Sequence, residues 1–485
     1  MWFFSISIFR YLVFLAIFLG VRELYAQPNS ANVRRGWQYK VAAGARMIYD
    51  CGGRQWMGYT PEGPTFMYSE TERTKEFVEL KDVRSGDSFR LFEDHCDKRK
   101  SNDGNWKRMT EGNWVIAPDP RQFDRFGPLD YCLRLVYFVP KDRSPKTDYA
   151  TRIRVVMEVV SEFFRRDLVS KRHRTEGLQF ERDENGLPVV HLVSGELTAS
   201  DYNDNGAFQS VRHHQRIASE INRQMRGDPA RRVVVVFAET YGDGPADLVW
   251  PGHIAQAFPL SPDGGNATFS AWMLQDEFCA LNVDDQKKLF FDDTPIRGRR
   301  AIGHSGPSSP VFEFVEDAFG GVIHEVGHAL GLPHDHRNAE IYIMGQGFRN
   351  LRWNFAPSRF RGRRVGFSRD NARLLMSSRY LSTEVDRLDY QPPTVKFELK
   401  GTSRGVEAIL QASDDQQLKM VVLIDEASRH RSTVYARALK GTSDGFQTRL
   451  PASVLNNSNE VRIRAFVVDS GGNYTRLSRG IPSKP

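Results

Sequence analysis

Several patterns that mark common protein classes are missing from this chain of 485 residues. The cysteines include no CxxC pair and no zinc-finger spacing, no heptad repeat is present, and no aromatic signature of an RNA-binding domain occurs. The net charge is +7, but the basic residues are dispersed except for short clusters at 297–300 and 359–364. A solvated basic surface explains this pattern, and we expect no nucleic-acid partner.

Long hydrophobic runs are also missing beyond the N-terminus, so we expect no integral membrane domain in the rest of the chain. Residues 1–26 contain an early arginine, an apolar stretch and a cleavage point after Ala26. This order is typical of a secretory signal peptide and predicts a protein that is secreted, extracellular or at the cell surface. An uncleaved N-terminal anchor is the alternative, because the apolar stretch is nearly long enough to span a bilayer.

Cysteine is scarce, with four in the chain: Cys51, Cys96, Cys132 and Cys279. Four cysteines fit disulfides in an exported protein and permit three pairings. We favour Cys51 with Cys96, because both lie in the N-terminal region.

The length and the 40% hydrophobic content predict two to four folded domains. Residues 27–126 contain short segments of alternating polarity, which predict a small β-rich domain with a hairpin turn at 110–113. Residues 127–390 alternate apolar strands, including one at 268–273, with amphipathic helices, which predicts an α/β layer structure. Residues 391–485 begin with QPP and contain five or more short strands, which predict a β-sandwich that resembles bacterial immunoglobulin-like modules.

The segment GGVIHEVGHALGLPHDH carries the strongest chemical signal. Residues four apart share one face of a helix, so His324 and His328 can present their imidazoles to one metal ion. Glu325 lies one step round the helix, where it can take a proton from a bound water. Gly331 permits a sharp turn, because glycine accepts positive φ at little cost, and the chain can then return His334 as a third ligand. Three histidines with one open coordination position are typical of a catalytic zinc site.

This segment resembles the metzincin zinc metallopeptidases, whose pattern HExxHxxGxxH is matched residue for residue by HEVGHALGLPH. Asp335, directly after the third histidine, is similar to adamalysin- and matrixin-like members, and Met344 resembles the methionine of the Met-turn beneath the metal. The resemblance implies a catalytic domain of the α/β (α+β) class with a mixed sheet and an active-site helix. It also implies a small lower subdomain closed by a helix over 367–381, with Ser368 as its N-cap.

The resemblance further implies a zinc-dependent endopeptidase that acts on protein or peptide substrates, with one Zn²⁺ as cofactor and Glu325 as general base. No GxSxG or papain-like cysteine motif points to covalent catalysis. The alternative is a cell-surface adhesion or binding protein, in which the β domains bind and the metal domain is a scaffold. A base beside three intact ligands favours the enzyme.

A second ion remains an alternative at DYNDNG, residues 201–206, which begins like a calcium loop. Arg212 stands where an EF-hand has its bidentate glutamate, which excludes an EF-hand. A looser Ca²⁺ site is the alternative to a simple helix cap and turn. The oligomeric state is left open.

Overall fold

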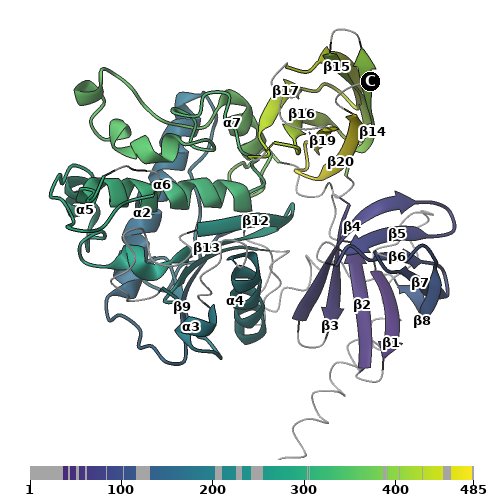
Figure 1. The fold of residues 1–485 in the computed structure, drawn as a ribbon, viewed down its shortest axis with the longest axis horizontal. Helices are drawn as coiled ribbons and strands as arrows, with labels where there is room; N and C mark the ends of the chain where they lie inside the picture. The colour runs from purple at the N-terminus through teal and green to yellow at the C-terminus, as the bar shows by residue number, and fades with distance from the viewer. Residues whose placement is uncertain are drawn as a thin grey trace, which may run out of the picture.

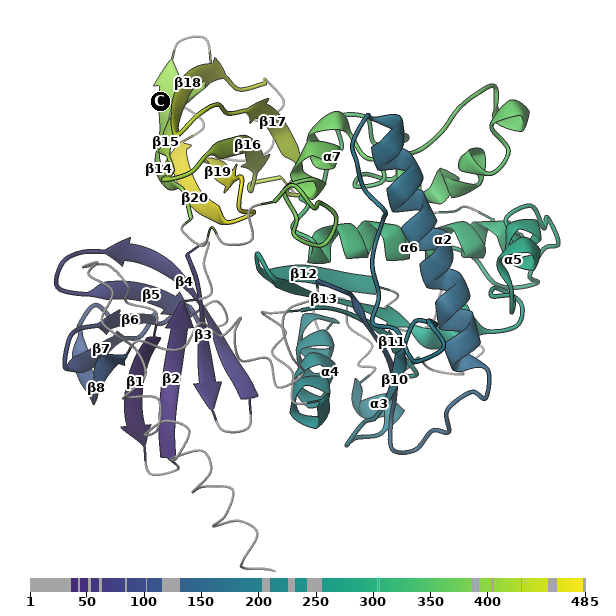
Figure 2. The same cartoon turned by 180° about the vertical axis from the view of Figure 1, so that it is seen from behind.

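The computed structural model describes residues 36–482 except for the segments 42–43, 51–53, 61–62, 83–84, 102, 116–130, 203–209, 226–231, 242–254, 303, 305, 386–388, 390–391, 403–404, 429 and 452–459. Three parts follow one another along the chain: an all-β N-terminal part, an α/β part and an all-β C-terminal part (Figures 1 and 2). The expected signal peptide at 1–26 lies outside the described residues. No helix within them is long and apolar enough to cross a membrane.

The N-terminal part is a closed barrel of eight antiparallel strands, in which each strand pairs with the next and β8 returns to pair with β1. Aromatic and aliphatic side chains fill the interior, among them Trp37, Trp56, Leu80 and Leu91. The strands are β1 (Gly36–Val41), β2 (Gly44–Asp50), β3 (Gln55–Thr60), β4 (Gly63–Arg73), β5 (Val78–Asp82), β6 (Ser88–Leu91), β7 (His95–Arg99) and β8 (Lys107–Val115). The small β-rich region is thus a barrel with its own core.

The prediction of a hairpin turn at 110–113 is wrong, because these residues lie inside β8. Gly112 is in the strand for a packing reason. A Cβ at this position would lie 2.5 Å from both the Trp37 ring and the Gln38 carbonyl oxygen. Glycine within a strand often marks such a close approach and not a turn.

The disulfide expected between Cys51 and Cys96 is not formed, because Cys96 is a free thiol buried in the barrel core. Burial raises the pKa of this thiol to about 12, so it stays protonated and packs as a small apolar side chain. Cys279 is likewise free and buried, with its pKa raised by burial to about 12. Cys51 lies outside the described residues.

The α/β part is built on a mixed five-stranded sheet with the order β10-β9-β11-β13-β12. Four strands are parallel: β9 (Arg134–Val139), β10 (Val190–Ser194), β11 (Val233–Ala238) and β13 (Gly264–Ser270). The edge strand β12 (Ala255–Ser261) is antiparallel to β13. The strand expected at 268–273 is the end of β13 followed by the 3₁₀ helix η3 (Ala271–Leu274), and β12 was not predicted.

Helices cover both faces of this sheet (Figures 1 and 2). Successive strand residues point to opposite faces, so Leu135 and Tyr137 join the core beneath α2 and α6, whereas Val136 and Phe138 pack toward α4. The helices are α2 (Tyr149–Ser170), α3 (Ala199–Tyr202), α4 (Ser210–Met225), α5 (Val283–Leu289), α6 (Val311–Ala329) and α7 (Arg369–Leu375), with short 3₁₀ helices η4 (Gly347–Asn354) and η5 (Pro357–Phe360). Ser368 caps α7 as expected, its hydroxyl accepting from the Asn371 N–H.

The C-terminal part consists of a three-stranded sheet, β14-β15-β18, and a four-stranded sheet, β17-β16-β19-β20. The four-stranded sheet is buried on both faces: Val421 and Leu423 join the core of the C-terminal part, and Met420 and Val422 join the core of the α/β part. The strands are β14 (Thr394–Thr402), β15 (Gly405–Ser413), β16 (Leu418–Asp425), β17 (Thr433–Ala438), β18 (Ser443–Arg449), β19 (Glu460–Asp469) and β20 (Tyr474–Pro482). The four-stranded sheet therefore lies between the core of the C-terminal part and the core of the α/β part.

Candidate metal centre

Helix α6 carries His324, Glu325 and His328 and is buried along most of its length. Three glycines, Gly320, Gly321 and Gly327, lie inside it, and each costs about 1 kcal/mol of helix propensity relative to alanine. Tertiary packing must offset this cost. Two of the glycines allow close approach: a Cβ at Gly320 would lie 2.2 Å from the Phe348 carbonyl oxygen, and one at Gly327 would lie 2.8 Å from the Met344 sulfur.

The end of α6 is formed by a Schellman turn centred on Gly331. The Gly331 N–H donates to the His328 carbonyl at 2.9 Å, and the Leu332 N–H donates to the Gly327 carbonyl at 3.0 Å. Gly331 has a φ of +97°, which favours glycine. The turn reverses the chain and brings His334 back beside the helix.

The three histidines converge through their Nε2 atoms. His328 Nε2 lies 3.1 Å from His324 Nε2 and 3.1 Å from His334 Nε2. Two ligands of a tetrahedral zinc ion at ~2.1 Å lie roughly 3.4 Å apart, which is close to the observed spacing. These residues can therefore hold one metal ion.

The hydrogen bonds of the other ring nitrogens fix the tautomers. His324 Nδ1 lies 2.7 Å from the Ile343 carbonyl oxygen, and His328 Nδ1 lies 2.7 Å from the Leu332 carbonyl oxygen. A carbonyl only accepts, so each Nδ1 carries the proton and each Nε2 lone pair faces the centre. Burial and the neighbouring imidazoles lower the pKa of all three histidines to about 3, which keeps them neutral, as metal ligands must be.

Glu325 lies between the histidines in sequence and is half-buried. Its carboxyl accepts a hydrogen bond from the backbone of Ala257 in β12, and burial raises its pKa to about 8. A cation held by the three imidazoles would oppose this shift, since a nearby positive charge favours the carboxylate. Glu325 thus faces the edge strand β12 from the position directly after His324 on α6.

Met344 and Asp335 are buried residues that support the metal site. Met344 is fully buried, and its carbonyl accepts from the Asp335 N–H at 2.9 Å. Asp335 is also fully buried and forms an ion pair with Arg337 at 2.6 Å. The residue before Met344, Ile343, provides the carbonyl that orients His324, so the turn at Met344 positions a ligand.

Two buried acids on α6 were missed by the sequence analysis. Glu316 and Asp317 pair with Arg352 at 3.5 Å and Arg349 at 3.3 Å, and Glu316 also accepts from the Arg352 N–H at 2.8 Å. Burial raises the pKa of Glu316 to about 8 and that of Asp317 to about 7. These pairs anchor η4 to α6. They hold the Phe348 ring 5.4 Å from the His324 ring. No local pattern marks such pairs, because each joins residues more than thirty positions apart.

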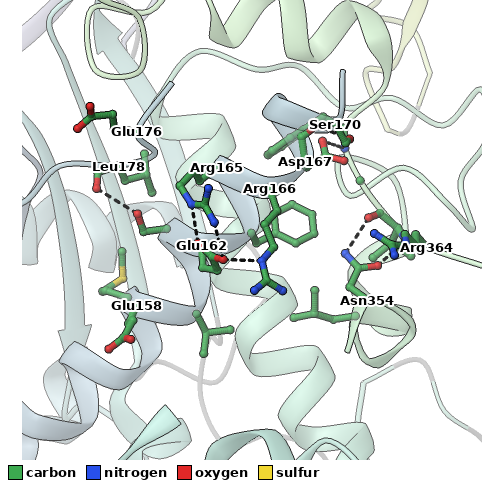
Figure 3. Close-up of a pocket in the computed structure, with 18 of the residues that line it drawn as sticks. Glu158, Glu162, Arg165, Arg166, Asp167, Ser170, Glu176, Leu178, Asn354 and Arg364 are labelled. Carbon is green, nitrogen blue, oxygen red and sulfur yellow. Dashed lines mark hydrogen bonds and ion pairs between the residues drawn. The ribbon is translucent and has the colours of Figure 1, made fainter. Parts of the chain in front are cut away.

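A large cavity of about 1450 Å³ lies beside α2, and none of the three histidines lines it (Figure 3). Several of its charged side chains pair with one another: Arg165 and Arg166 both donate to Glu162, and Lys171 donates to Asp167 at 2.5 Å. Charges that are already paired leave little driving force for a charged ligand. We assign the chemistry to the three histidines.

The calcium alternative gains no support. Most of the loop at 201–206 lies outside the described residues. A different group of acids is a second possible cation site: the carboxylate oxygens of Asp389, Asp414 and Asp469 lie within 4.8 Å of one another. Burial and Asp389 raise the pKa of Asp469 to about 8, so a proton can relieve the repulsion there without a cation.

Comparisons with known proteins give a limited result. No family model and no curated protein matches the chain. The chain is similar to solved structures of OgpA from Akkermansia muciniphila. A catalytically inactive form in complex with an O-glycopeptide substrate, glycodrosocin, has a TM-score of 0.49 and 15% identity, and the match covers 72% of this chain and 92% of that one. A wild-type form has a TM-score of 0.48 and 16% identity, over 73% of this chain and 93% of that one. At these values the likeness carries no conclusion about activity, which has to come from the residues of this chain.

Proposed function

We propose that this protein is a secreted zinc-dependent endopeptidase with His324, His328 and His334 as metal ligands and Glu325 as general base. The observation that carries the proposal is the convergence of three neutral Nε2 atoms, two of them from α6, the helix that also carries Glu325. The N-terminal segment 1–26 supports export.

The donor set fits zinc, since neutral imidazoles at this spacing leave one coordination position open. When bound, zinc supplies Lewis-acid polarisation of a carbonyl and acidifies water. Glu325 accepts the proton of the attacking water and then passes it to the departing amine, so no covalent intermediate forms. The Ala257 N–H holds the carboxyl in place for both transfers.

The edge strand β12 supports a peptide as substrate. Within the described residues no strand pairs with the outer side of β12. An extended peptide can add to such an edge through backbone hydrogen bonds. Because Glu325 accepts a hydrogen bond from Ala257 in the middle of β12, a peptide that lies along this edge passes beside the proposed base.

The test is hydrolysis of a complex peptide mixture by the purified protein, with cleavage products identified by mass spectrometry. Glu325→Gln and chelator-treated samples are the controls. Cleavage that disappears in both controls supports the proposal and reports subsite preference. A protein that binds no zinc, or one whose cleavage survives in Glu325→Gln, contradicts it.

A further inference from the structure

A loop of the C-terminal part, residues 425–433, reaches the third histidine of the metal centre. The Thr433 N–H donates to the His334 carbonyl at 2.9 Å. The Ser432 hydroxyl accepts from the His336 N–H at 2.9 Å. His334 and Ser432 therefore pair as a short parallel bridge. The backbone that follows His334 is thus held by residues almost one hundred positions further along the chain.

The imidazole of His334 depends on the same loop. His324 and His328 are oriented by carbonyls from the α/β part, at Ile343 and Leu332. The His334 ring instead hydrogen bonds to the backbone of His430. One of the three outer partners of the metal ligands thus comes from the C-terminal part.

The C-terminal part is fixed in this position by a buried contact. Arg379 is fully buried and pairs with Asp263, in the turn between β12 and β13. It also donates to the Gly471 carbonyl at 2.8 Å and to Asn473 Oδ1 at 3.0 Å. The Arg379 side chain therefore joins the turn between β12 and β13 to the turn before β20. This contact holds the C-terminal part, and with it the loop 425–433, beside His334.

We propose that the C-terminal part is a component of the metal centre, in which the backbone of residues 430–433 positions His334 for metal binding. The proposal rests on the zinc site proposed above. Partners that orient metal ligands typically contribute about 10- to 100-fold to metal affinity. The C-terminal part is then required for tight zinc binding even though it supplies no ligand.

Thr433→Pro removes the N–H that donates to His334, and proline is tolerated at the first residue of a strand. Ser443→Pro is the matched control, because Ser443 is also the first residue of a strand, on the edge of the far sheet. Ser432→Ala removes one hydrogen bond without touching the backbone, and Ser432→Thr restores the hydroxyl.

The dissociation constant for zinc is measured by competition with a chromophoric chelator, and the visible spectrum of the Co²⁺-loaded protein reports the ligand geometry. Thr433→Pro is expected to weaken zinc binding by about 10- to 100-fold and to change the Co²⁺ bands. Ser432→Ala is expected to weaken it by about two- to tenfold, the worth of one ordinary hydrogen bond, and Ser432→Thr to restore it. Ser443→Pro is expected to match the wild type.

Wild-type zinc affinity and Co²⁺ bands in both Ser432→Ala and a folded Thr433→Pro overturn the inference and leave the zinc site itself intact. If Thr433→Pro does not fold, Ser432→Ala and its threonine rescue decide the question. A wild type that binds no zinc removes the proposed function first, so the two failures are distinguishable.

Discussion

Two adjacent glycines in α6 provide a matched test of how tightly this helix, which carries His324 and His328, is packed. A Cβ at Gly320 would lie 2.2 Å from the carbonyl oxygen of Phe348 and 2.8 Å from its carbonyl carbon. At Gly321 a Cβ would meet nothing within 4 Å. The same substitution, Gly→Ala, therefore adds the same methyl group to the same helix in opposite surroundings.

Both variants gain about 1 kcal/mol of helix propensity. Gly321→Ala is expected to keep this gain. Gly320→Ala must push η4 away, and overpacking of this kind costs about 1–3 kcal/mol or more, because the contact is with backbone that cannot rotate aside. Since the propensity gain offsets part of this cost, we expect a net loss of up to ~2 kcal/mol in Gly320→Ala and a difference of ~1–3 kcal/mol between the two variants.

Thermal unfolding followed by circular dichroism measures this difference. One kcal/mol corresponds to about 2–4 °C for a domain of this size, so the two midpoints are expected ~2–12 °C apart. Gly320→Ala is also expected to bind zinc more weakly, since η4 carries the Phe348 ring that contacts His324. Equal midpoints for the two variants would refute the close approach of η4 to α6.

Three further outcomes are expected. In Glu325→Gln the rate of peptide hydrolysis is expected to fall by about 10²- to 10⁴-fold. Metal analysis should find an unchanged zinc content, because Glu325 acts as a base and is not a metal ligand. A parallel loss of zinc would contradict its role as the base. Gly327→Ala displaces the Met344 sulfur, which lies 2.8 Å from the added Cβ. The neighbouring Ile343 carbonyl, which orients His324, moves with it. Competition with a chelator should therefore show weaker zinc binding in a folded protein. In the metal-free protein the pKa of each ligand histidine is lowered from 6.5 to about 3. The histidines of the unfolded chain therefore bind protons at a higher pH than those of the folded protein. As a result, the free energy of unfolding decreases as the pH falls from 6.5 toward 3. Urea unfolding at pH 7 and pH 5 with chelator checks this, and His328→Gln should show a shallower pH dependence.

The sequence predicted the local geometry of the metal site because that geometry is encoded within a few residues. A spacing of four on a helix places His324 beside His328, and Gly331 at a φ of +97° returns His334, so three ligands follow from eleven consecutive positions. Their roles as ligands stay a prediction until metal is measured. The arrangement of strands and helices in the α/β part followed from apolar periodicity in the same way.

The rest of the site depends on contacts between distant residues, which a local pattern does not encode. β12 contains Pro259 and partly exposed residues, so it lacks the apolar run by which β11 is recognised. The contact of Thr433 with His334 joins two parts that look separate in the sequence. Gly112 was interpreted as a turn because the Trp37 ring that requires it lies in a strand far away.

The barrel at the N-terminus has a consequence for the proposed peptidase function. A peptidase that captures extended backbone along a strand edge, as proposed for β12, also meets the strands of other copies of its own chain. Because β8 closes onto β1, the barrel leaves no unpaired strand along its circumference for another copy to capture. Under the proposed function, self-cleavage sites are therefore expected in connecting segments and not in the eight paired strands.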